Sequence, residues 1–249
     1  MNDASILENK NYVRIHLITY GNDLYKKQRV LFRKLAENAR FFDKITVFTP
    51  RNLDKKFRNK FQSVLQLSKG AGYWIWKPYL LKRMIGQIPH NDILIYCDAG
   101  CLINGEGRRR FTYYIERLQH TPTGSLAFEL PYKEYEYTKR EVFNYFKCEK
   151  DIKISNQLVG GVLLFRKCNH SNNLIDTYFN VLQDNVLLFT DEKNRDIQDE
   201  KFIDHRHDQS VFSIIRKQLG TDILPDETYF TDFLNDGLKY PIWAARMKG

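Results

Sequence analysis

The run Ile93-Leu94-Ile95-Tyr96-Cys97 constrains the fold most, because it holds five apolar residues in succession and is followed at once by Asp98. Strands that are apolar on both faces are typical of a parallel sheet with helices on both sides. In such sheets, ligands bind beyond the carboxyl ends of the strands. The run therefore predicts an α/β fold in which Asp98 lies at a ligand-binding edge.

Apolar periodicity upstream of this run switches between strand and helix patterns. Residues 13–20 and 45–48 are predicted strands, and each is followed by an amphipathic helix, the second at residues 53–67. A third helix is expected to begin near Pro78 and to end at about Gln87. This alternation indicates a mostly parallel central sheet flanked by helices.

The pattern continues less regularly after Asp98. Helices are expected at residues 108–119, 172–185 and 207–219, and strands at residues 125–129 and 158–166. We find no repeat, low-complexity run or linker in the sequence, so we expect one domain over residues 1–249.

Composition bounds the class of protein and its compartment. With 249 residues, 43% of them hydrophobic and 28% charged, the chain is typical of a soluble globular protein. The N-terminus carries Asp3 and Glu8 and lacks the basic start and apolar core of a signal peptide. No apolar run approaches the ~20 residues that span a bilayer. The four cysteines lack paired Cys-x-x-Cys spacing and are expected as reduced thiols rather than zinc ligands. We therefore expect a cytoplasmic protein.

The formal net charge of +9 predicts attraction to an anionic partner. Nucleic acid, an acidic membrane surface and a phosphorylated substrate all satisfy this expectation, and charge alone does not choose among them. Arg108, Arg109 and Arg110 form a local cluster that could contact the inner face of a membrane. A solvated helix face is the simpler explanation of this cluster.

Residues 70–78 combine glycines, aromatic rings and a lysine just before Pro78. At a helix start, free backbone amides favour phosphate, and Lys77 adds a full positive charge. Trp76 could stack on a base or a sugar ring, but a place in the core is equally consistent with it. Tyr20, at the end of the first predicted strand, allows the same two interpretations.

Asp98 could bind a divalent cation that bridges a diphosphate, or it could accept hydrogen bonds from ribose hydroxyls. The small residues Ala99 and Gly100 would let a bulky ligand approach the backbone. The simpler alternative is a turn aspartate that caps the next segment.

Two further carboxylates lie at the ends of predicted elements. Asp208 and Gln209 open the last predicted helix, where capping is the ordinary role of an aspartate. Glu129 ends the strand at residues 125–129 and could bind sugar hydroxyls or act as a general base.

Together these segments resemble the GT-A superfamily of glycosyltransferases, in particular small bacterial and large-DNA-virus enzymes that build surface polysaccharide. The resemblance spans most of the chain. It is carried by Thr19-Tyr20-Gly21-Asn22, Gly-x-Gly-Tyr-Trp-x-Trp-Lys-Pro at residues 70–78, Ile95-Tyr96-Cys97-Asp98-Ala99-Gly100, Gly160-Gly161-Val162-Leu163-Leu164 and Asp208-Gln209. The third of these segments looks like the DXD-containing strand, and the last two are distantly similar to segments of family 8 transferases.

The resemblance implies a single GT-A domain with a nucleotide-binding part at about residues 12–105 and an acceptor or sugar part at about residues 106–249. It implies that the nucleotide-sugar is bound by Thr19, Tyr20, Gly21, Trp76, Lys77, Asp98, Ala99, Gly100, Gly160 and Gly161. Asp208 would bind sugar hydroxyls and Gln209 would lie near the anomeric carbon, with Glu129 as a further catalytic candidate. The Asp-Gln pair slightly favours retention of the anomeric configuration.

The chain departs from the family pattern at three places. Gly100 replaces the second DXD carboxylate, Val159 replaces an asparagine before the glycine pair, and residues 229–249 contain no histidine for a metal site. A divalent cation, Mn²⁺ or Mg²⁺, could be held by Asp98 together with water and phosphate oxygens. Alternatively, basic residues such as Lys77 and Arg246 could neutralise the leaving diphosphate.

The leading hypothesis is a transferase that moves a sugar from a nucleotide-diphosphate-sugar to a glycan or lipid-linked acceptor in surface polysaccharide synthesis. A UDP-sugar is the expected donor. One rival is a nucleotidyltransferase, but nothing near the first strand resembles its Gly-rich, Arg-Lys phosphate loop. A nucleic-acid-binding protein would suit the charge of +9 and the 14% aromatic content, although these residues do not converge in one motif. A catalytically silent GT-A domain is the third rival, because Gly100 weakens the metal site.

Overall fold

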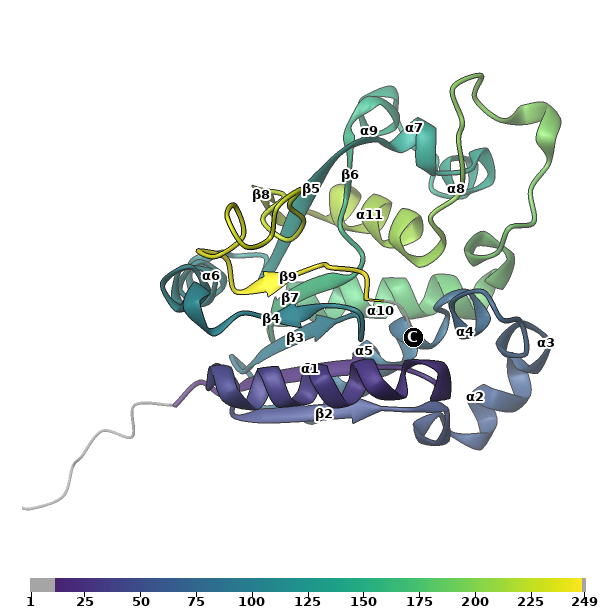
Figure 1. Cartoon of the computed structure of the whole chain (residues 1–249). Coiled ribbons are helices and arrows are strands. Elements are labelled where there is room, and N and C mark those ends of the chain that lie inside the picture. The colour runs from purple at the N-terminus through teal and green to yellow at the C-terminus, as the bar shows by residue number, and fades with distance from the viewer. Residues whose placement is uncertain (1–11, 248–249) are drawn as a thin grey trace, which may run out of the picture.

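A central sheet of seven strands runs through the computed structural model, which describes residues 12–247 (Figure 1). The strand order is β2-β1-β3-β7-β5-β6, and β8 also pairs with β5. The strands are β1 (Ile15–Tyr20), β2 (Lys44–Phe48), β3 (Ile93–Cys97), β5 (Ser125–Lys133), β6 (Asn156–Leu158), β7 (Val162–Arg166) and β8 (Asp222–Pro225).

Most strands of this sheet share one direction. β2, β1 and β3 are parallel neighbours, with Leu17 opposite both Ile45 in β2 and Ile95 in β3. β7 runs antiparallel to its neighbours β3 and β5, β6 is antiparallel to β5, and β8 is parallel to β5. The carboxyl ends of β1, β2, β3, β5 and β8 therefore lie at one edge. The expectation of an α/β domain with a mostly parallel sheet flanked by helices is confirmed.

Helices cover both faces of the sheet. The longer ones are α1 (Lys26–Ala39), α5 (Trp76–Gln87), α6 (Arg108–His120), α10 (Asn169–Asp184) and α11 (His207–Leu219). Short α-helices are α2 (Lys55–Lys60), α3 (Gln62–Leu65), α4 (Gly70–Tyr73), α7 (Glu134–Tyr137), α8 (Arg140–Tyr145) and α9 (Lys150–Ile154). Single 3₁₀ turns are η1 (Asp23–Tyr25), η2 (Pro50–Asn52), η3 (Gly105–Gly107), η4 (Val186–Phe189) and η5 (Arg195–Ile197).

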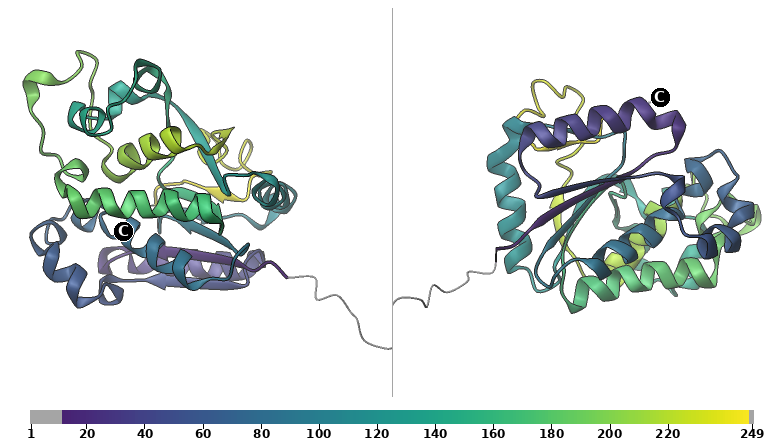
Figure 2. Two further views of the ribbon diagram at one scale, coloured as in Figure 1. Left: turned by 180° about the vertical axis from the view of Figure 1, so that it is seen from behind. Right: turned by 90° about the horizontal axis from the view of Figure 1, so that it is seen from below.

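The apolar strand β3 packs against a different core on each face. Leu94 and Tyr96 face the core shared with α5, α10 and α11, whereas Ile93, Ile95 and Cys97 face the core shared with α1 and α6. All five side chains are 0% exposed, and burying an aliphatic side chain of this size contributes roughly 1.5–3 kcal/mol. Figure 2 shows α1 (purple) and α10 (green) on opposite sides of the sheet. The ends of β3 are thereby fixed.

Two expected elements are divided in the structure. The expected strand at residues 158–166 is two strands, because β6 pairs with β5 whereas β7 also pairs with β3. Gly160 and Gly161 lie at the step between them. The expected helix at residues 53–67 is broken into α2 and α3, because Phe61 leaves helical geometry with φ −110°.

A separate two-stranded sheet brings the C-terminal residues back to the carboxyl edge. β4 (Leu102–Ile103) pairs antiparallel with β9 (Ile242–Trp243). Beyond β9, the backbone N–H of Met247 donates to the carbonyl oxygen of Gly100 at 3.0 Å. The last described residue therefore lies on the turn that carries Asp98.

The arginines expected at a membrane face are largely used within the protein. Arg108 donates to the carbonyl oxygen of Ala39, and Arg110 forms a two-bond ion pair with Glu227. No helix within residues 12–247 is long and apolar enough to cross a membrane. Residues 1–11, on which the signal-peptide expectation rests, lie outside the described residues. Arg108 and Arg109 are exposed, and Arg110 is half-buried.

Candidate active site

Lys77 lies in the first turn of α5 and connects three other segments. Its Nζ atom donates to Asp208 Oδ2 at 2.5 Å and to the carbonyl oxygen of Gly160 at 3.0 Å, and lies 3.4 Å from Asp98 Oδ1. Asp98 follows β3, Asp208 begins α11 and Gly160 precedes β7. We call Lys77, Asp98, Gly160 and Asp208 the Lys77 centre. Its ammonium group has three donors, and protein oxygen atoms face all of them.

Negative charge exceeds positive charge at the Lys77 centre. Burial alone would lower the pKa of Lys77, but the charges of Asp208 and Asp98 outweigh it and raise this pKa. Burial raises the pKa of Asp208 to about 6, against the opposing effect of Lys77. At neutral pH one ammonium group therefore faces two carboxylates. The surplus negative charge is accessible at Asp98, whose side chain is 39% exposed against 7% for Asp208.

Tyr96 holds the exposed carboxylate in place. Its hydroxyl donates to Asp98 Oδ1 at 2.5 Å, and burial raises the pKa of Tyr96 well above its ordinary value, so the phenol remains a donor. Asp98 Oδ2 accepts no hydrogen bond from the residues that the structure describes. A Cβ atom at Gly161 would lie 2.8 Å from this oxygen. Asp98 thus presents one free oxygen atom, and glycine at position 161 leaves room for it.

Gln209 is oriented by the backbone next to the Lys77 centre. Its Oε1 atom accepts the N–H of Gly160 at 2.9 Å, and its Nε2 atom donates to Gln157 Oε1 at 2.6 Å. A Cβ atom at Gly160 would lie 2.6 Å from that of Gln209. The glycine therefore allows the contact, and the N–H donor determines which way the Gln209 amide points.

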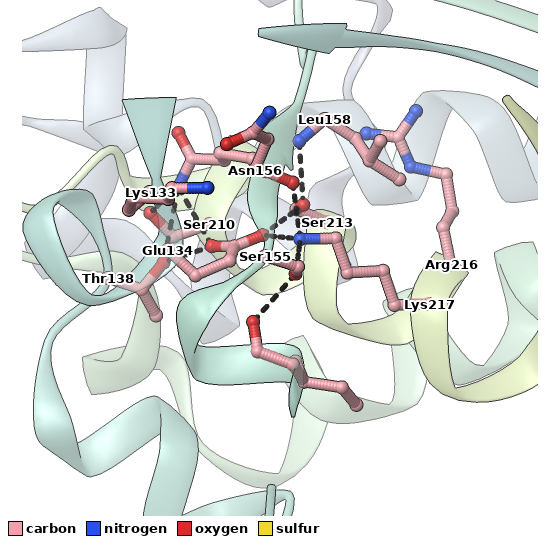
Figure 3. Close-up of polar contacts among 12 residues, drawn as sticks. Lys133, Glu134, Thr138, Ser155, Asn156, Leu158, Ser210, Ser213, Arg216 and Lys217 are labelled. Carbon is pink, nitrogen blue, oxygen red and sulfur yellow. Dashed lines mark hydrogen bonds and ion pairs between the residues drawn. The ribbon is translucent and has the colours of Figure 1, made fainter. Parts of the chain in front are cut away.

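The hydrogen bonds continue from Gln157 to a fully buried carboxylate, Glu134. Gln157 Nε2 donates to Glu134 Oε2 at 3.2 Å, and Thr138 donates to the same oxygen at 2.6 Å. Lys217 Nζ lies 2.7 Å from Glu134 Oε1, and Ser213 also donates to that oxygen. Figure 3 shows Lys217 and Ser213 pointing toward Glu134 from α11. This hydrogen-bonded network extends from Gln209 through Gln157 to Glu134 and restricts the orientation of the Gln209 side chain.

Residues 70–74 enter the site with left-handed backbone geometry. Positive φ values between 50° and 91° occur at Gly70, Ala71, Gly72, Tyr73 and Trp74. His207, directly before Asp208, has φ 50°, and its ring stacks on Trp74 with centroids 5.4 Å apart. Such geometry costs a non-glycine residue on the order of 1 kcal/mol or more. Packing and hydrogen bonds must therefore stabilise the strained backbone that precedes Lys77 and Asp208.

The N-terminal candidates lie beside this centre but are largely enclosed. Tyr20 and Trp76 stack on each other with ring centroids 3.8 Å apart, and both are buried. The ring faces that meet in this stack are closed to a ligand. Thr19 is buried as well, and its hydroxyl has no hydrogen-bond partner within residues 12–247. Gly21 follows directly, where a Cβ atom would lie 3.0 Å from the Tyr25 and Arg29 side chains. A role for these four residues in nucleotide binding remains a prediction.

The turn after Asp98 is covered by the C-terminal segment. Ala99 is 5% exposed, and a Cβ atom at Gly100 would lie 3.0 Å from the carbonyl oxygen of Met247. The absence of a side chain at Gly100 therefore leaves space for the backbone of Arg246 and Met247. Arg246 belongs to the same covering segment.

Glu129 lies apart from the Lys77 centre, in the middle of β5, which continues to Lys133 instead of ending at Glu129 as the sequence predicted. No hydrogen bond or ion pair joins it to that centre within the described residues. It lines a separate cavity of about 440 Å³ together with Asp226 and Arg246. The structure thus brings Lys77, Asp98, Asp208, Gln209, Gly160 and Gly161 together and places Glu129 in a second position.

A divalent cation would find only part of its ligands here. Within residues 12–247, no group of three or more His, Cys, Asp or Glu side chains could hold a metal ion. Asp98 offers one free carboxylate oxygen, whereas Asp208 is paired with Lys77. One carboxylate suffices where a diphosphate and water supply the other ligands, as is usual for Mg²⁺. The residues fit a cation that arrives with a diphosphate and do not fit a metal held by protein side chains alone.

Structural comparison decides the fold family. The chain superposes on a glycosyltransferase involved in the glycosylation of the major capsid of PBCV-1, over 92% of both chains, with a TM-score of 0.54 at 8% identity. The chain has the GT-A glycosyltransferase fold. At this identity the likeness concerns the fold alone.

Two further solved glycosyltransferases match this chain with TM-scores below 0.5. Mouse xyloside xylosyltransferase 1 matches 93% of this chain and 97% of its own, with 15% identity and a TM-score of 0.48. The galactosyltransferase LgtC, solved with donor and acceptor sugar analogues, matches 92% and 86%, with 12% identity and a TM-score of 0.46. At these scores neither extends the argument. No family model and no curated protein matches the sequence.

Sequence reasoning missed three polar residues of the site: Tyr96, Gln157 and Glu134. A signal for Tyr96 was available, because residues two apart on a strand share a face and Tyr96 precedes Asp98 by two. Gln157 and Glu134 carry no comparable signal, since their partners come from α11, more than 50 residues away. Only the folded chain brings them together.

Proposed function

We propose that the protein is a glycosyltransferase that moves a sugar from a nucleotide-diphosphate-sugar, with a UDP-sugar as the expected donor, to a glycan or lipid-linked acceptor. The observation that carries the proposal is the Lys77 ammonium group held between Asp98 and Asp208 at the carboxyl edge of a GT-A sheet. Ligands of open α/β sheets bind at this edge. Synthesis of a surface polysaccharide is the proposed role.

The diphosphate is proposed to lie beside Asp98. The surplus negative charge of the Lys77 centre would repel a diphosphate, so a compensating cation is required. Asp98 Oδ2 would supply one ligand to Mg²⁺ or Mn²⁺, and such a cation neutralises the charge on a departing diphosphate. Lys77 is 2% exposed, so its role is to hold Asp98 and Asp208 rather than to touch phosphate. Residues 12–105 would form the nucleotide-binding part, with Thr19, Tyr20, Gly21, Trp76, Ala99 and Gly100 near the nucleotide.

The sugar of the donor is proposed to lie between Asp98 and the start of α11. Gly160 and Gly161 leave space there, because a side chain at either position would collide with Gln209 or Asp98. Asp208 would orient sugar hydroxyls and Gln209 would lie near the anomeric carbon. The network behind Gln209 fixes its amide before the donor arrives, which is the arrangement that electrostatic catalysis requires. Retention of the anomeric configuration is the proposed outcome, and NMR of the product checks it.

The test is release of nucleoside diphosphate from a panel of UDP-sugars by Asp98→Asn. We expect a loss of about 10²–10³-fold in turnover, because the free carboxylate oxygen is removed while the fold is kept. Asp176→Asn is the matched control, since Asp176 is also a partly exposed partner of a lysine, Lys82, but lies on α10 away from the site. Equal turnover in Asp98→Asn and wild type would remove Asp98 from the mechanism.

A second measurement addresses the cation separately. Thermal shifts with UDP are recorded with Mn²⁺ and with EDTA, because a ligand that binds only the native state raises its stability. We expect a shift that needs the metal. A shift of equal size in EDTA would contradict the cation at Asp98 and leave neutralisation to basic residues such as Arg246.

A further inference from the structure

A second cavity, of about 440 Å³, lies at the same edge of the sheet as Asp98. It is formed where β5 and β8 end and where β6 begins. Its principal lining side chains are Glu129, Tyr132, Asn156, Asp226, Tyr229 and Arg246. We call it the Glu129 cavity.

The polar groups of the Glu129 cavity are largely left without protein partners. The side chains of Glu129, Asn156 and Arg246 make no hydrogen bond or ion pair with any residue that the structure describes. Asp226 accepts Thr228 through Oδ1. Polar groups that a protein brings together in a cavity without pairing them are available to a ligand.

Two carboxylates and one guanidinium group line the cavity, and a second guanidinium group lies over the ring of one lining residue, Tyr132. Glu129 and Asp226 oppose an anionic ligand, and burial raises the pKa of Asp226, which shows that this carboxylate is already partly desolvated. Arg246 opposes a cationic ligand, and so does Arg206, whose guanidinium lies 4.4 Å from the centroid of the Tyr132 ring. An uncharged ligand with several hydroxyl groups meets neither obstacle.

An aromatic ring in the lining of the cavity, that of Tyr229, adds an apolar surface. Tyr229 is 51% exposed, and Arg246 lies 5.4 Å from its ring centroid. A pyranose ring has an apolar C–H face and a rim of hydroxyl groups, so it can pack on an aromatic ring while carboxylate and amide groups bind the rim. We propose that the Glu129 cavity binds an uncharged sugar ring, the terminal unit of the acceptor.

The C-terminal segment that lines the cavity also covers the turn after Asp98. Arg246 lines the cavity, and its backbone carbonyl carbon lies 3.5 Å from the position of a Cβ atom at Gly100. Met247, the next residue, bonds to Gly100. An acceptor ring bound there would sit across this segment from a donor at Asp98. The assignment of the ligand as an acceptor rests on the proposed function, whereas sugar binding by the cavity can be tested without it.

The probes are the methyl glycosides of glucose, galactose, mannose and xylose, observed by saturation-transfer difference NMR on the full chain. We expect at least one glycoside to bind wild type, and binding to weaken about tenfold in Tyr229→Ala and in Asp226→Asn. Tyr229→Phe keeps the ring and should retain most of the binding. Tyr145→Ala is the matched control, because Tyr145 is 39% exposed and lies on α8 outside the cavity. Circular dichroism confirms that each variant is folded.

Three outcomes separate this inference from the proposed function. Absence of signal for every glycoside, or equal signal in the cavity variants and wild type, overturns the sugar site. A UDP-induced thermal shift in the same samples reports the donor site separately, so such a shift without a glycoside signal contradicts the cavity alone. A glycoside signal that Tyr229→Ala removes, without a shift from any nucleotide, supports the cavity and counts against sugar transfer.

Discussion

The Lys77 centre and the Glu129 cavity lie at the same edge of the sheet. The polar side chains of the centre are paired with other protein groups, whereas those of the cavity are largely unpaired. At the centre, Lys77 is 2% exposed and its ammonium group is surrounded by protein oxygen atoms. In the cavity, Glu129 and Arg246 have no hydrogen-bond or ion-pair partner within residues 12–247. Buried polar groups must be paired, so the centre is built before any ligand arrives. The cavity instead leaves these groups available to a ligand.

This difference suits the Lys77 centre to holding groups in a fixed position and the Glu129 cavity to binding a ligand. A paired, buried charge cluster changes geometry little when a ligand binds, which suits residues that must hold reacting atoms in place. Unpaired groups around an open cavity tolerate ligands of several shapes. We therefore expect substitutions at the centre to affect stability and turnover together, and substitutions in the cavity to affect binding of one substrate.

The largest expected effect comes from breaking the centre with Lys77→Met. Removal of one partner of a buried ion pair leaves an uncompensated charge, so we expect the free energy of unfolding to fall by about 3–5 kcal/mol. Lys82→Met is the control, because Lys82 lies on α5 as Lys77 does and also pairs with an aspartate, Asp176 of α10, but its side chain is 44% exposed. Exposed pairs contribute about 0–1 kcal/mol. Urea unfolding of both variants measures the difference, and equal losses would contradict the contrast between a buried centre and an exposed pair.

A smaller effect is expected from Gly161→Ala. The added methyl group would lie 2.8 Å from Asp98 Oδ2, so the carboxylate must move by several tenths of an ångström. Misplacement of a reacting group by about 1 Å can cost about 10²-fold in rate, and we expect turnover to fall by about 10–100-fold with little unfolding. Gly86→Ala in α5 is the control, since nothing lies within 4 Å of its added methyl group. Unchanged turnover in Gly161→Ala would show that Asp98 does not need its present position.

Acidification by one pH unit below pH 6 should give the smallest effect and distinguish activity from stability. Burial raises the pKa of Asp208 from 3.8 to about 6, so protonation below pH 6 weakens its pairing with Lys77. We expect the rate to fall about tenfold per pH unit below pH 6. Because the folded pKa lies above the unfolded value, the contribution of Asp208 to stability changes in the opposite sense. It is fully present below about pH 4 and is lost as the pH rises through 6.

Rate and unfolding measured together across pH 4–8 test this pair of trends. Asp208→Asn cannot ionise, so its remaining rate should lack the acidic limb. An unchanged acidic limb in Asp208→Asn would assign the titration to another group. The control for general acid sensitivity is Asp176→Asn, whose profile should match that of wild type.

Local pattern predicted the elements that are internally regular. The apolar run of β3 and the amphipathic helix at residues 207–219, which is α11, could be placed because their periodicity is contained within a few turns or residues. Asp98 could be placed at the carboxyl edge of the sheet because it directly follows β3. β8 could not be predicted, because it has four residues, ends in Pro225 and is defined only by its pairing with β5.

The contacts of the site could not be predicted from local pattern. Lys77 and Asp208 are separated by 131 positions, and each is explained separately by a helix start or a helix cap. The Glu129 cavity needs the ends of β5 and β8, the start of β6 and the segment after β9 at once. Periodicity identifies which face of an element is buried but not which distant element covers it.

The bond from Met247 to Gly100 has a practical consequence for protein engineering. Met247 is two positions from the last residue of the printed sequence, and it already lies on the turn that carries Asp98. Gly100→Ala would place a methyl group 3.0 Å from the carbonyl oxygen of Met247, so a change in this turn also displaces the segment that covers it.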